Sequence, residues 1–105
     1  VGAASVHMDA KRFARAEALY REGLAIRRKS LPAGHRYIGE TLSDLGDCLM
    51  AQRRYREAGM LLAEALELLR QAEGEDASRT KRARARVAEL EKMAPGVTQA
   101  GRPQS

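Results

Sequence analysis

The residues with the most reactive side chains in this sequence are a single cysteine, Cys48, and two histidines, His7 and His35. Neither histidine has a cysteine or a carboxylate at the spacing that zinc ligands show. Cys48 lies beside apolar packing residues, so we expect a small buried hydrophobe rather than a reactive thiol. The sequence contains no glycine-rich phosphate loop, no nucleophile motif and no paired catalytic carboxylates. We therefore predict a chain that is not an enzyme and needs no metal and no cofactor.

Charged residues are the other candidates for chemistry, and their distribution is uneven. The net charge is +5, and the segment RTKRARARVAELEK, residues 79–92, is mostly basic, which makes a nucleic acid a partner to consider. Residues 57–76 are mostly acidic instead, and an acidic helix beside the basic one would neutralise part of that charge. No aromatic residue lies among these arginines to stack on a base. Nucleic-acid binding through residues 79–92 is therefore disfavoured.

The features that the sequence lacks predict the cellular compartment of the chain. No apolar run approaches the roughly 20 residues of a transmembrane helix, and VGAASVHMD at the start has no secretion-signal pattern. A single cysteine forms no internal disulfide, which favours a cytoplasmic protein. The frequency of Arg and Ala suggests a bacterium with a GC-rich genome. Because the pattern is already under way at Val1, we expect the chain to be a piece of a longer protein.

Four apolar stripes with a spacing of three and four residues predict the helices that position these side chains. We expect helices at about 13–30, 36–52, 55–73 and 78–93, with a short helical segment before Asp9. The break between the first two helices contains Pro32 and Gly34. The break between the last two contains residues 74–78, where Asp76 and Ser78 are suitable N-caps. Residues 95–105 are polar, with Gly and Pro, and we expect a disordered tail.

The sequence also matches itself at an offset of 42 residues, which is the mark of a repeat architecture. Aromatic, small and apolar positions all agree in this one alignment, and so do the loops. The matched pairs are Phe13 with Tyr55, Ala16 with Ala58, Leu19 with Leu61, Glu22 with Glu64, Leu24 with Leu66, and Arg28 with Arg70.

The pattern Leu42-x₂-Leu45-Gly46-x₂-Leu49, followed by Tyr55-x₂-Ala58-x₃-Leu62-x₂-Ala65, resembles a tetratricopeptide repeat. The 42-residue spacing is similar to the kinesin-light-chain type of this repeat. The resemblance implies an all-α fold, in which antiparallel helix hairpins stack as a right-handed superhelix. It places one full repeat at about 36–73 and a capping helix at about 78–93 in a domain of residues 1–94.

The small residues of this pattern have a steric role. Gly46 and Ala58 would lie where the two helices of one hairpin approach closely, and Ala65 would do the same against the next repeat. Glycine in a helix costs on the order of 1 kcal/mol relative to alanine, so it needs such a reason. Arg53 departs from the family pattern, because a glycine is usual at that turn. In the last helix, Ala83, Val87, Leu90 and Ala94 make a better packing stripe than the strict repeat alignment provides.

In tetratricopeptide repeats the first helix of each hairpin lines a concave groove for peptides, and the resemblance therefore implies a binding face here. A groove with arginines beside carboxylates suits a peptide of mixed charge, and we expect Arg82 and Arg86 to be exposed. Ser43 and Asp47 replace the Lys and Asn that clamp a terminal carboxylate in some family members, which disfavours that ligand. The predicted peptide-binding residues are Glu40, Ser43, Asp47, Met50, Arg82, Arg86 and Glu89.

These observations predict a protein–protein interaction module that binds a peptide or a partner protein. The alternative is a C-terminal regulatory or scaffold region of a larger bacterial signalling enzyme such as a protein kinase, since such repeats often follow signalling domains. Self-association is a further expectation, because repeats share their apolar faces with neighbours and the end near residues 13–24 is open.

Overall fold

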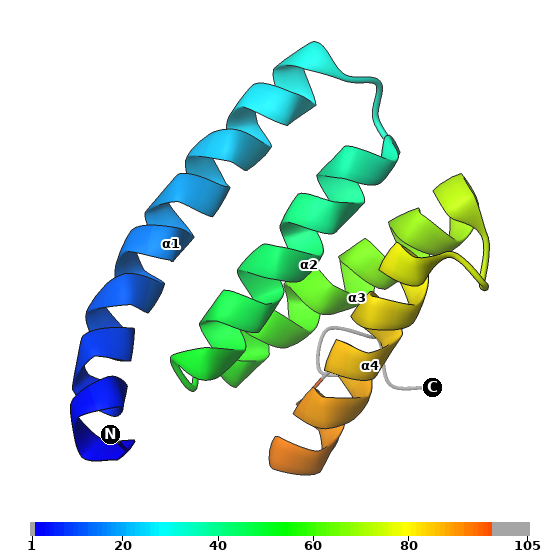
Figure 1. Cartoon of the computed structure of the whole chain (residues 1–105). Helices are drawn as coiled ribbons and strands as arrows, with labels where there is room; N and C mark the ends of the chain where they lie inside the picture. The colour runs from blue at the N-terminus through cyan, green and yellow to red at the C-terminus, as the bar shows by residue number, and fades with distance from the viewer. Residues whose placement is uncertain (1, 98–105) are drawn as a thin grey trace.

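A computed structural model of the chain describes the backbone of residues 2–97 and the side chains of residues 12–97. Within this range the secondary structure is helical throughout, with no strand (Figure 1). The all-α prediction is therefore confirmed. The helices are α1 (Gly2–Ser30), α2 (Arg36–Ala51), α3 (Tyr55–Glu73) and α4 (Ser78–Met93).

The bounds of α2, α3 and α4 agree with the expected ranges to within one residue, whereas α1 does not. It begins at Gly2 and runs without a break, so the expected separate segment before Asp9 is instead the first part of one long helix. No proline or glycine pair interrupts residues 3–22 to stop it. Consecutive helices run antiparallel (Figure 1).

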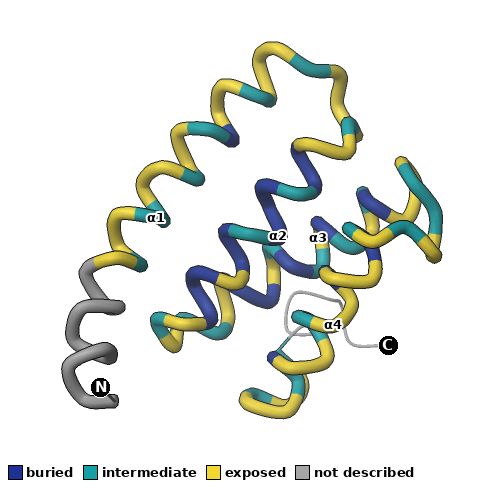
Figure 2. Tube along the Cα trace, viewed as in Figure 1, coloured by how far each residue is buried: buried dark blue, intermediate teal, exposed yellow. Residues whose placement is uncertain are grey.

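The second helix, α2, lies at the centre of the fold. It packs against α1 on one side and against α3 on the other, and α4 packs against α3 and also contacts α2. Figure 2 shows that α2 is the most buried of the four helices, while α1 is largely exposed. The largest fully buried side chains are Leu42, Leu45, Leu49, Leu62, Leu69, Leu90 and Thr80.

Two glycines allow α2 to approach α3 closely. A Cβ atom added at Gly46 would lie 2.6 Å from Leu62 Cγ, and one added at Gly39 would lie 2.8 Å from Leu69 Cγ. Carbon atoms in ordinary contact are about 3.5–4.0 Å apart, so neither position has room for a side chain. Ala58 is fully buried at the same contact. The predicted close approach at Gly46 and Ala58 is confirmed, and Gly39 is a second such point that the sequence analysis missed.

Arg53, which stands where the family pattern has a glycine, lies in the turn between α2 and α3. The N–H of Arg53 donates to the carbonyl of Met50 (2.9 Å) and that of Arg54 to the carbonyl of Leu49 (3.0 Å). These two bonds form a Schellman cap, which requires a left-handed residue. Arg53 supplies it with φ of 65°, a conformation that glycine adopts at lower cost.

The starts of α2 and α4 differ in their caps. The Nδ1 atom of His35 accepts a hydrogen bond from the N–H of Tyr37 (3.1 Å) and so caps α2. At α4, however, the expected caps Asp76 and Ser78 are wrong. Ala77 holds the cap position without a side-chain hydrogen bond, and Ser78 is already the first residue of the helix.

Helix α4 packs through the face that contains residues 83, 87, 90 and 94. Ala83 and Leu90 are fully buried, and Val87 packs against the core. Residues 95–97, the first residues of the expected tail, lie against the helices: the Gly96 N–H donates to Glu91 (2.9 Å), and Val97 contacts the core cluster. The rest of the expected tail, residues 98–105, lies outside the described residues.

Candidate functional site

Four of the seven predicted binding residues come together between α2 and α4. Arg82 and Arg86 of α4 lie opposite Glu40 and Ser43 of α2, and they line one shallow hollow that is too small to hold a water molecule. Acidic side chains of the central helix therefore face basic side chains of the last helix. The remaining lining residues of the hollow are Asp44, Leu69 and Arg79.

Arg86 closes one end of this hollow. Its Nη1 atom donates to Ser43 Oγ (2.8 Å) and to Asp44 Oδ1 (2.9 Å), and its Nε atom lies 3.9 Å from Asp47 Oδ1. Only 20% of its side chain is exposed. The expectation that Arg86 is exposed is therefore wrong, because the long side chain folds back onto the carboxylates of α2.

Arg79 closes the other end. Its guanidinium lies 3.2 Å from Glu40 and 3.1 Å from Glu73, the last residue of α3. The sequence analysis did not select Arg79, Asp44 or Glu73 as site residues. Their contacts depend on the path of the loop that leads into α4, and no sequence motif predicts that path.

The other predicted binding residues separate into two groups. Ser43 is buried beneath Arg86, and Met50 is buried in the core cluster. Asp47 is half exposed at 51% of its side chain, and Arg82 and Glu89 are exposed. Asp47, Arg82 and Glu89 are therefore the predicted binding residues that are exposed to solvent.

An aromatic ring does lie among arginines, contrary to the sequence analysis. The guanidinium carbons of Arg27, Arg36 and Arg79 lie 5.2, 5.1 and 5.6 Å from the centre of the Tyr37 ring. Each distance is within the range of a cation–π contact. These arginines come from three different helices, so the sequence order hides the cluster.

The basic character of α4 is reduced by its neighbours, as expected. Arg79, Arg84 and Arg86 all form ion pairs with carboxylates outside α4. Arg84 contacts Glu75 in the loop before the helix. Less positive charge is therefore available to a nucleic acid than the sequence of residues 79–92 implies.

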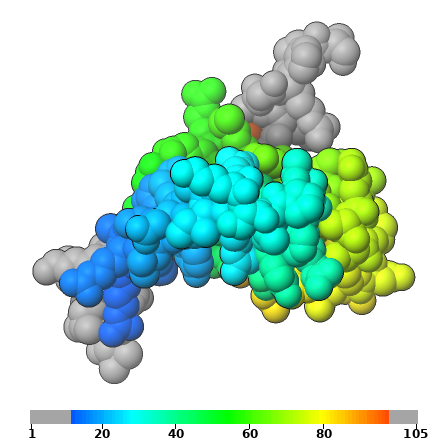
Figure 3. Space-filling model, turned by 90° about the horizontal axis from the view of Figure 1, so that it is seen from above, coloured from blue at the N-terminus to red at the C-terminus, as the bar shows by residue number. Residues whose placement is uncertain are grey.

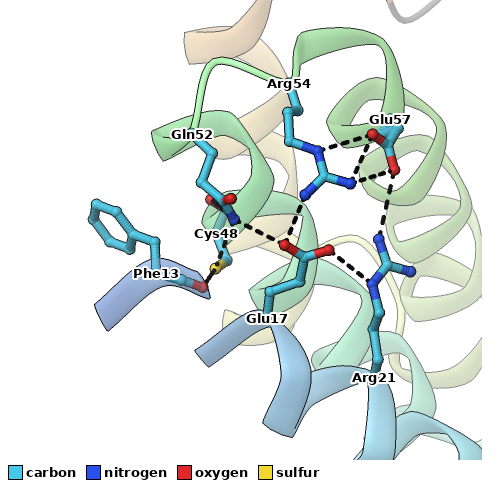
Figure 4. A network of polar contacts seen from close by, with 7 residues as sticks. All are labelled: Phe13, Glu17, Arg21, Cys48, Gln52, Arg54 and Glu57. Atoms are coloured by element: carbon cyan, nitrogen blue, oxygen red, sulfur yellow. Dashed lines mark hydrogen bonds and ion pairs between the residues drawn. The ribbon is translucent and has the colours of Figure 1, made fainter. Parts of the chain in front are cut away.

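A second polar network fastens α1 to the turn between α2 and α3 (Figure 4). Glu17 accepts hydrogen bonds from Arg54 (2.7 Å), Arg21 (2.9 Å) and Gln52 (3.1 Å). Burial alone would raise the pKa of Glu17, but the hydrogen bonds from Arg21 and Gln52 and the nearby arginine charges outweigh it and hold the pKa below its usual value. This network is structural, because its members bind one another across three elements.

Cys48 belongs to the edge of this network. Its thiol is buried and donates to the backbone carbonyl of Phe13 (3.0 Å). Burial raises the pKa of the thiol, which keeps it protonated and unreactive at neutral pH. The predicted burial of Cys48 is confirmed.

Residues 12–97 contain no group of three or more His, Cys, Asp or Glu side chains that could hold a metal ion. None of the helices described has the length and apolarity needed to cross a membrane.

A sequence model of the tetratricopeptide repeat family matches residues 1–71, which include α1, α2 and most of α3. No curated protein and no solved structure matches the chain significantly. The family match covers more than half of the 105 residues, and the chain belongs to the tetratricopeptide repeat family. Such repeats are protein–protein interaction modules, and the partners of this chain are accordingly proteins.

Proposed function

We propose that the chain binds a peptide segment of mixed charge on the face between α2 and α4, without catalysis of its own. The observation that carries this proposal is the row of carboxylates on α2 that faces a row of arginines on α4. Charged groups at the rim of an interface select partners by complementarity and speed their approach. A peptide with both acidic and basic side chains matches this face.

The exposed members of the face are the ones that select the peptide. Arg82 receives an acidic side chain, and Asp47 receives a basic one. Glu89 lies on the exposed side of α4 and adds a second acceptor for a basic group. Met50 is excluded from this role, because it is buried in the core.

Arg86 has a different role in this proposal. Ser43 and Asp44 hold its guanidinium in place, so a ligand carboxylate that uses Arg86 must compete with Asp44. Arg86 then orders the floor of the binding face, and its replacement would disturb α4 as well as any ligand. A test of binding should therefore change Arg82 and Asp47 rather than Arg86.

The test begins with an array of immobilised peptides in which acidic and basic residues alternate at varied spacings. The best binder is then titrated against the wild-type chain, Arg82→Glu and Asp47→Lys. Arg56→Glu is the matched control, because Arg56 is exposed on α3 and forms no ion pair within the described residues. We expect each face variant to weaken binding about tenfold, which corresponds to about 1.4 kcal/mol, and the control to leave it unchanged.

Equal losses in the face variants and in Arg56→Glu would contradict the proposal, and so would an array without any binder. A duplex DNA of arbitrary sequence serves as a second ligand in the same assay. Binding of that duplex with a steep dependence on salt would favour the electrostatic nucleic-acid alternative instead.

A further inference from the structure

One exposed tyrosine, Tyr37, lies among arginines and has no part in the proposed function. It is the second residue of α2 and is 36% exposed. Tyr20 and Tyr55, the other two tyrosines of the chain, are partly buried and pack against the core. Figure 3 views the molecule from the end where Tyr37 lies and shows the end of α1 and the loop before α2, coloured cyan, at the surface. An enzyme in solution therefore reaches Tyr37 more easily than the other two tyrosines.

The three arginines around the Tyr37 ring differ in how strongly carboxylates hold them. Two carboxylates hold Arg79, at 3.1 and 3.2 Å. Arg36 has one looser contact, 3.8 Å from a carboxylate. Arg27 donates to the backbone carbonyl of Tyr37 (3.2 Å) and has no ion pair with a carboxylate among residues 12–97. The charges of Arg27 and Arg36 therefore remain available to a further anion beside this ring.

The start of α2 adds to the attraction for an anion. The N-terminus of a helix carries partial positive charge, and the first turn of α2 contains no acidic residue. A phosphate monoester carries about −1.5 to −2 charges at neutral pH and three strong acceptor oxygens, which the fork of an arginine side chain matches. A carboxylate carries a single negative charge. A phosphate is therefore the anion that best suits two arginines at this place.

The geometry favours a phosphate attached to Tyr37 over a free one. The guanidinium carbons of Arg27 and Arg36 lie 5.2 and 5.1 Å from the centre of the ring, so small rotations of these long side chains bring them to a group on the ring hydroxyl. A phosphate on that hydroxyl stays beside the arginines at a high effective concentration. A dissolved anion would instead lose its translational freedom on binding.

We propose that Tyr37 is a phosphorylation site and that Arg27 and Arg36 bind the phosphate that it acquires. A tyrosine kinase transfers the γ-phosphoryl group of a nucleoside triphosphate: the hydroxyl oxygen of Tyr37 forms the new P–O bond, its proton passes to the base of the kinase, and the nucleoside diphosphate leaves. Because Arg27 belongs to α1, the phosphate ties the end of α1 to the start of α2. The proposal involves none of the residues that select the peptide and does not depend on the function proposed there.

The binding of the phosphate is tested on the full chain with phosphotyrosine incorporated at position 37 during expression. Phosphorus NMR follows the second pKa of the phosphate. We expect this pKa to be lower, by at least about half a pH unit, than in a peptide of residues 33–41 with the same phosphotyrosine, because the peptide lacks Arg27. Arg27→Gln should remove about half of the difference. Arg28→Gln is the matched control and should leave it unchanged, because Arg28 pairs with Glu64 of α3 (3.1 Å) instead.

The tie between α1 and α2 is tested by melting temperatures at neutral pH. The phosphorylated chain should melt about 4 °C above the unmodified chain, and this gain should be absent when both forms carry Arg27→Gln. The gain is complete above the ordinary second pKa of the phosphate and is lost as the pH falls through the lowered value of the folded chain. An unchanged second pKa, or the same gain with and without Arg27→Gln, overturns the proposal.

The choice of Tyr37 is tested with a panel of tyrosine kinases of broad specificity, which receive the folded full chain and ATP. Mass spectrometry of peptides then locates the phosphate. We expect it on Tyr37, and Tyr37→Phe should abolish its incorporation while circular dichroism shows unchanged helices. Incorporation at Tyr20 or Tyr55 ahead of Tyr37 overturns the proposal, and so does the absence of phosphate on Tyr37 with every kinase of the panel.

Discussion

At the scale of single residues, Gly46 shows how contact geometry changes an expectation drawn from helix propensity. Propensity alone favours Gly46→Ala, but the new Cβ would lie 2.6 Å from Leu62 Cγ, and Leu62 is fully buried. We predict that Gly46→Ala lowers the free energy of unfolding and that Gly46→Leu lowers it further, by about 1–3 kcal/mol or more. Urea denaturation measures both.

The control for this prediction lies in the same chain. Gly23 is also helical, but a Cβ atom there would meet nothing within 4 Å. Gly23→Ala should therefore raise the free energy of unfolding by about 0.5–1 kcal/mol, because alanine is the better helix former. Stabilisation by alanine at both glycines would show that α2 and α3 are not in close contact at Gly46.

Thr80 provides a second prediction at this scale. Its side chain is fully buried, and its hydroxyl has no hydrogen-bond partner among residues 12–97. Valine has nearly the same shape without the hydroxyl, so Thr80→Val should raise the free energy of unfolding by about 1 kcal/mol. Thr80→Ser, which keeps the hydroxyl and removes a methyl group, should lower it. Thermal melts that place both variants below the wild type would argue for an unseen partner of the hydroxyl.

Glu17 makes the stability of the fold depend on pH. Its pKa in the folded chain lies below the ordinary value of 4.5. A lowered pKa contributes stability that is complete above the ordinary value and is lost as the pH falls through the folded value. We predict that Glu17→Gln destabilises the chain by about 1–3 kcal/mol at neutral pH and that its difference from the wild type shrinks in acid. Melting temperatures measured from neutral pH down to strongly acidic pH check this, and a difference that stays constant would contradict it.

At the scale of elements, the turn between α2 and α3 is a point of strain. Arg53 adopts a left-handed conformation, which costs roughly 1–2 kcal/mol for a residue with a side chain. Glycine removes this cost but adds disorder to the unfolded chain, so we predict a net stabilisation of up to about 1 kcal/mol for Arg53→Gly. Chemical denaturation checks it. A loss of stability would mean that the contacts of the Arg53 side chain stabilise the fold by more than its left-handed conformation costs.

The helices themselves follow from the sequence because their signals are local. The stripes of α2 and α3, the breaks at Pro32 and Gly74, and the small residues Gly46 and Ala58 all report on neighbouring turns of helix. Gly39 was detectable in the same way, since it lies seven residues before Gly46 and so on the same side of α2. The start of α1 was missed because its first residues carry a weak apolar pattern.

At the scale of the whole molecule, the face between α2 and α4 depends on side-chain contacts that local sequence signals do not predict. A helical projection gives the direction of a Cβ atom, and it places Glu40 and Ser43 on one side of α2. It does not show where a long side chain ends, and Arg86 therefore appears exposed although it reaches Ser43 and Asp44. The cluster around Tyr37 draws one arginine from each of three helices, so only the packing of those helices reveals it.

The central claim is that the face between α2 and α4 binds a peptide of mixed charge, and its location can be measured directly. The best peptide from the array is titrated into the isotopically labelled chain, and amide chemical shifts are followed residue by residue. The account predicts that the largest changes fall at Asp47, Arg82 and Glu89, with little change along the exposed side of α3 near Arg56. Changes spread evenly over all basic residues, or concentrated on α3, would contradict it.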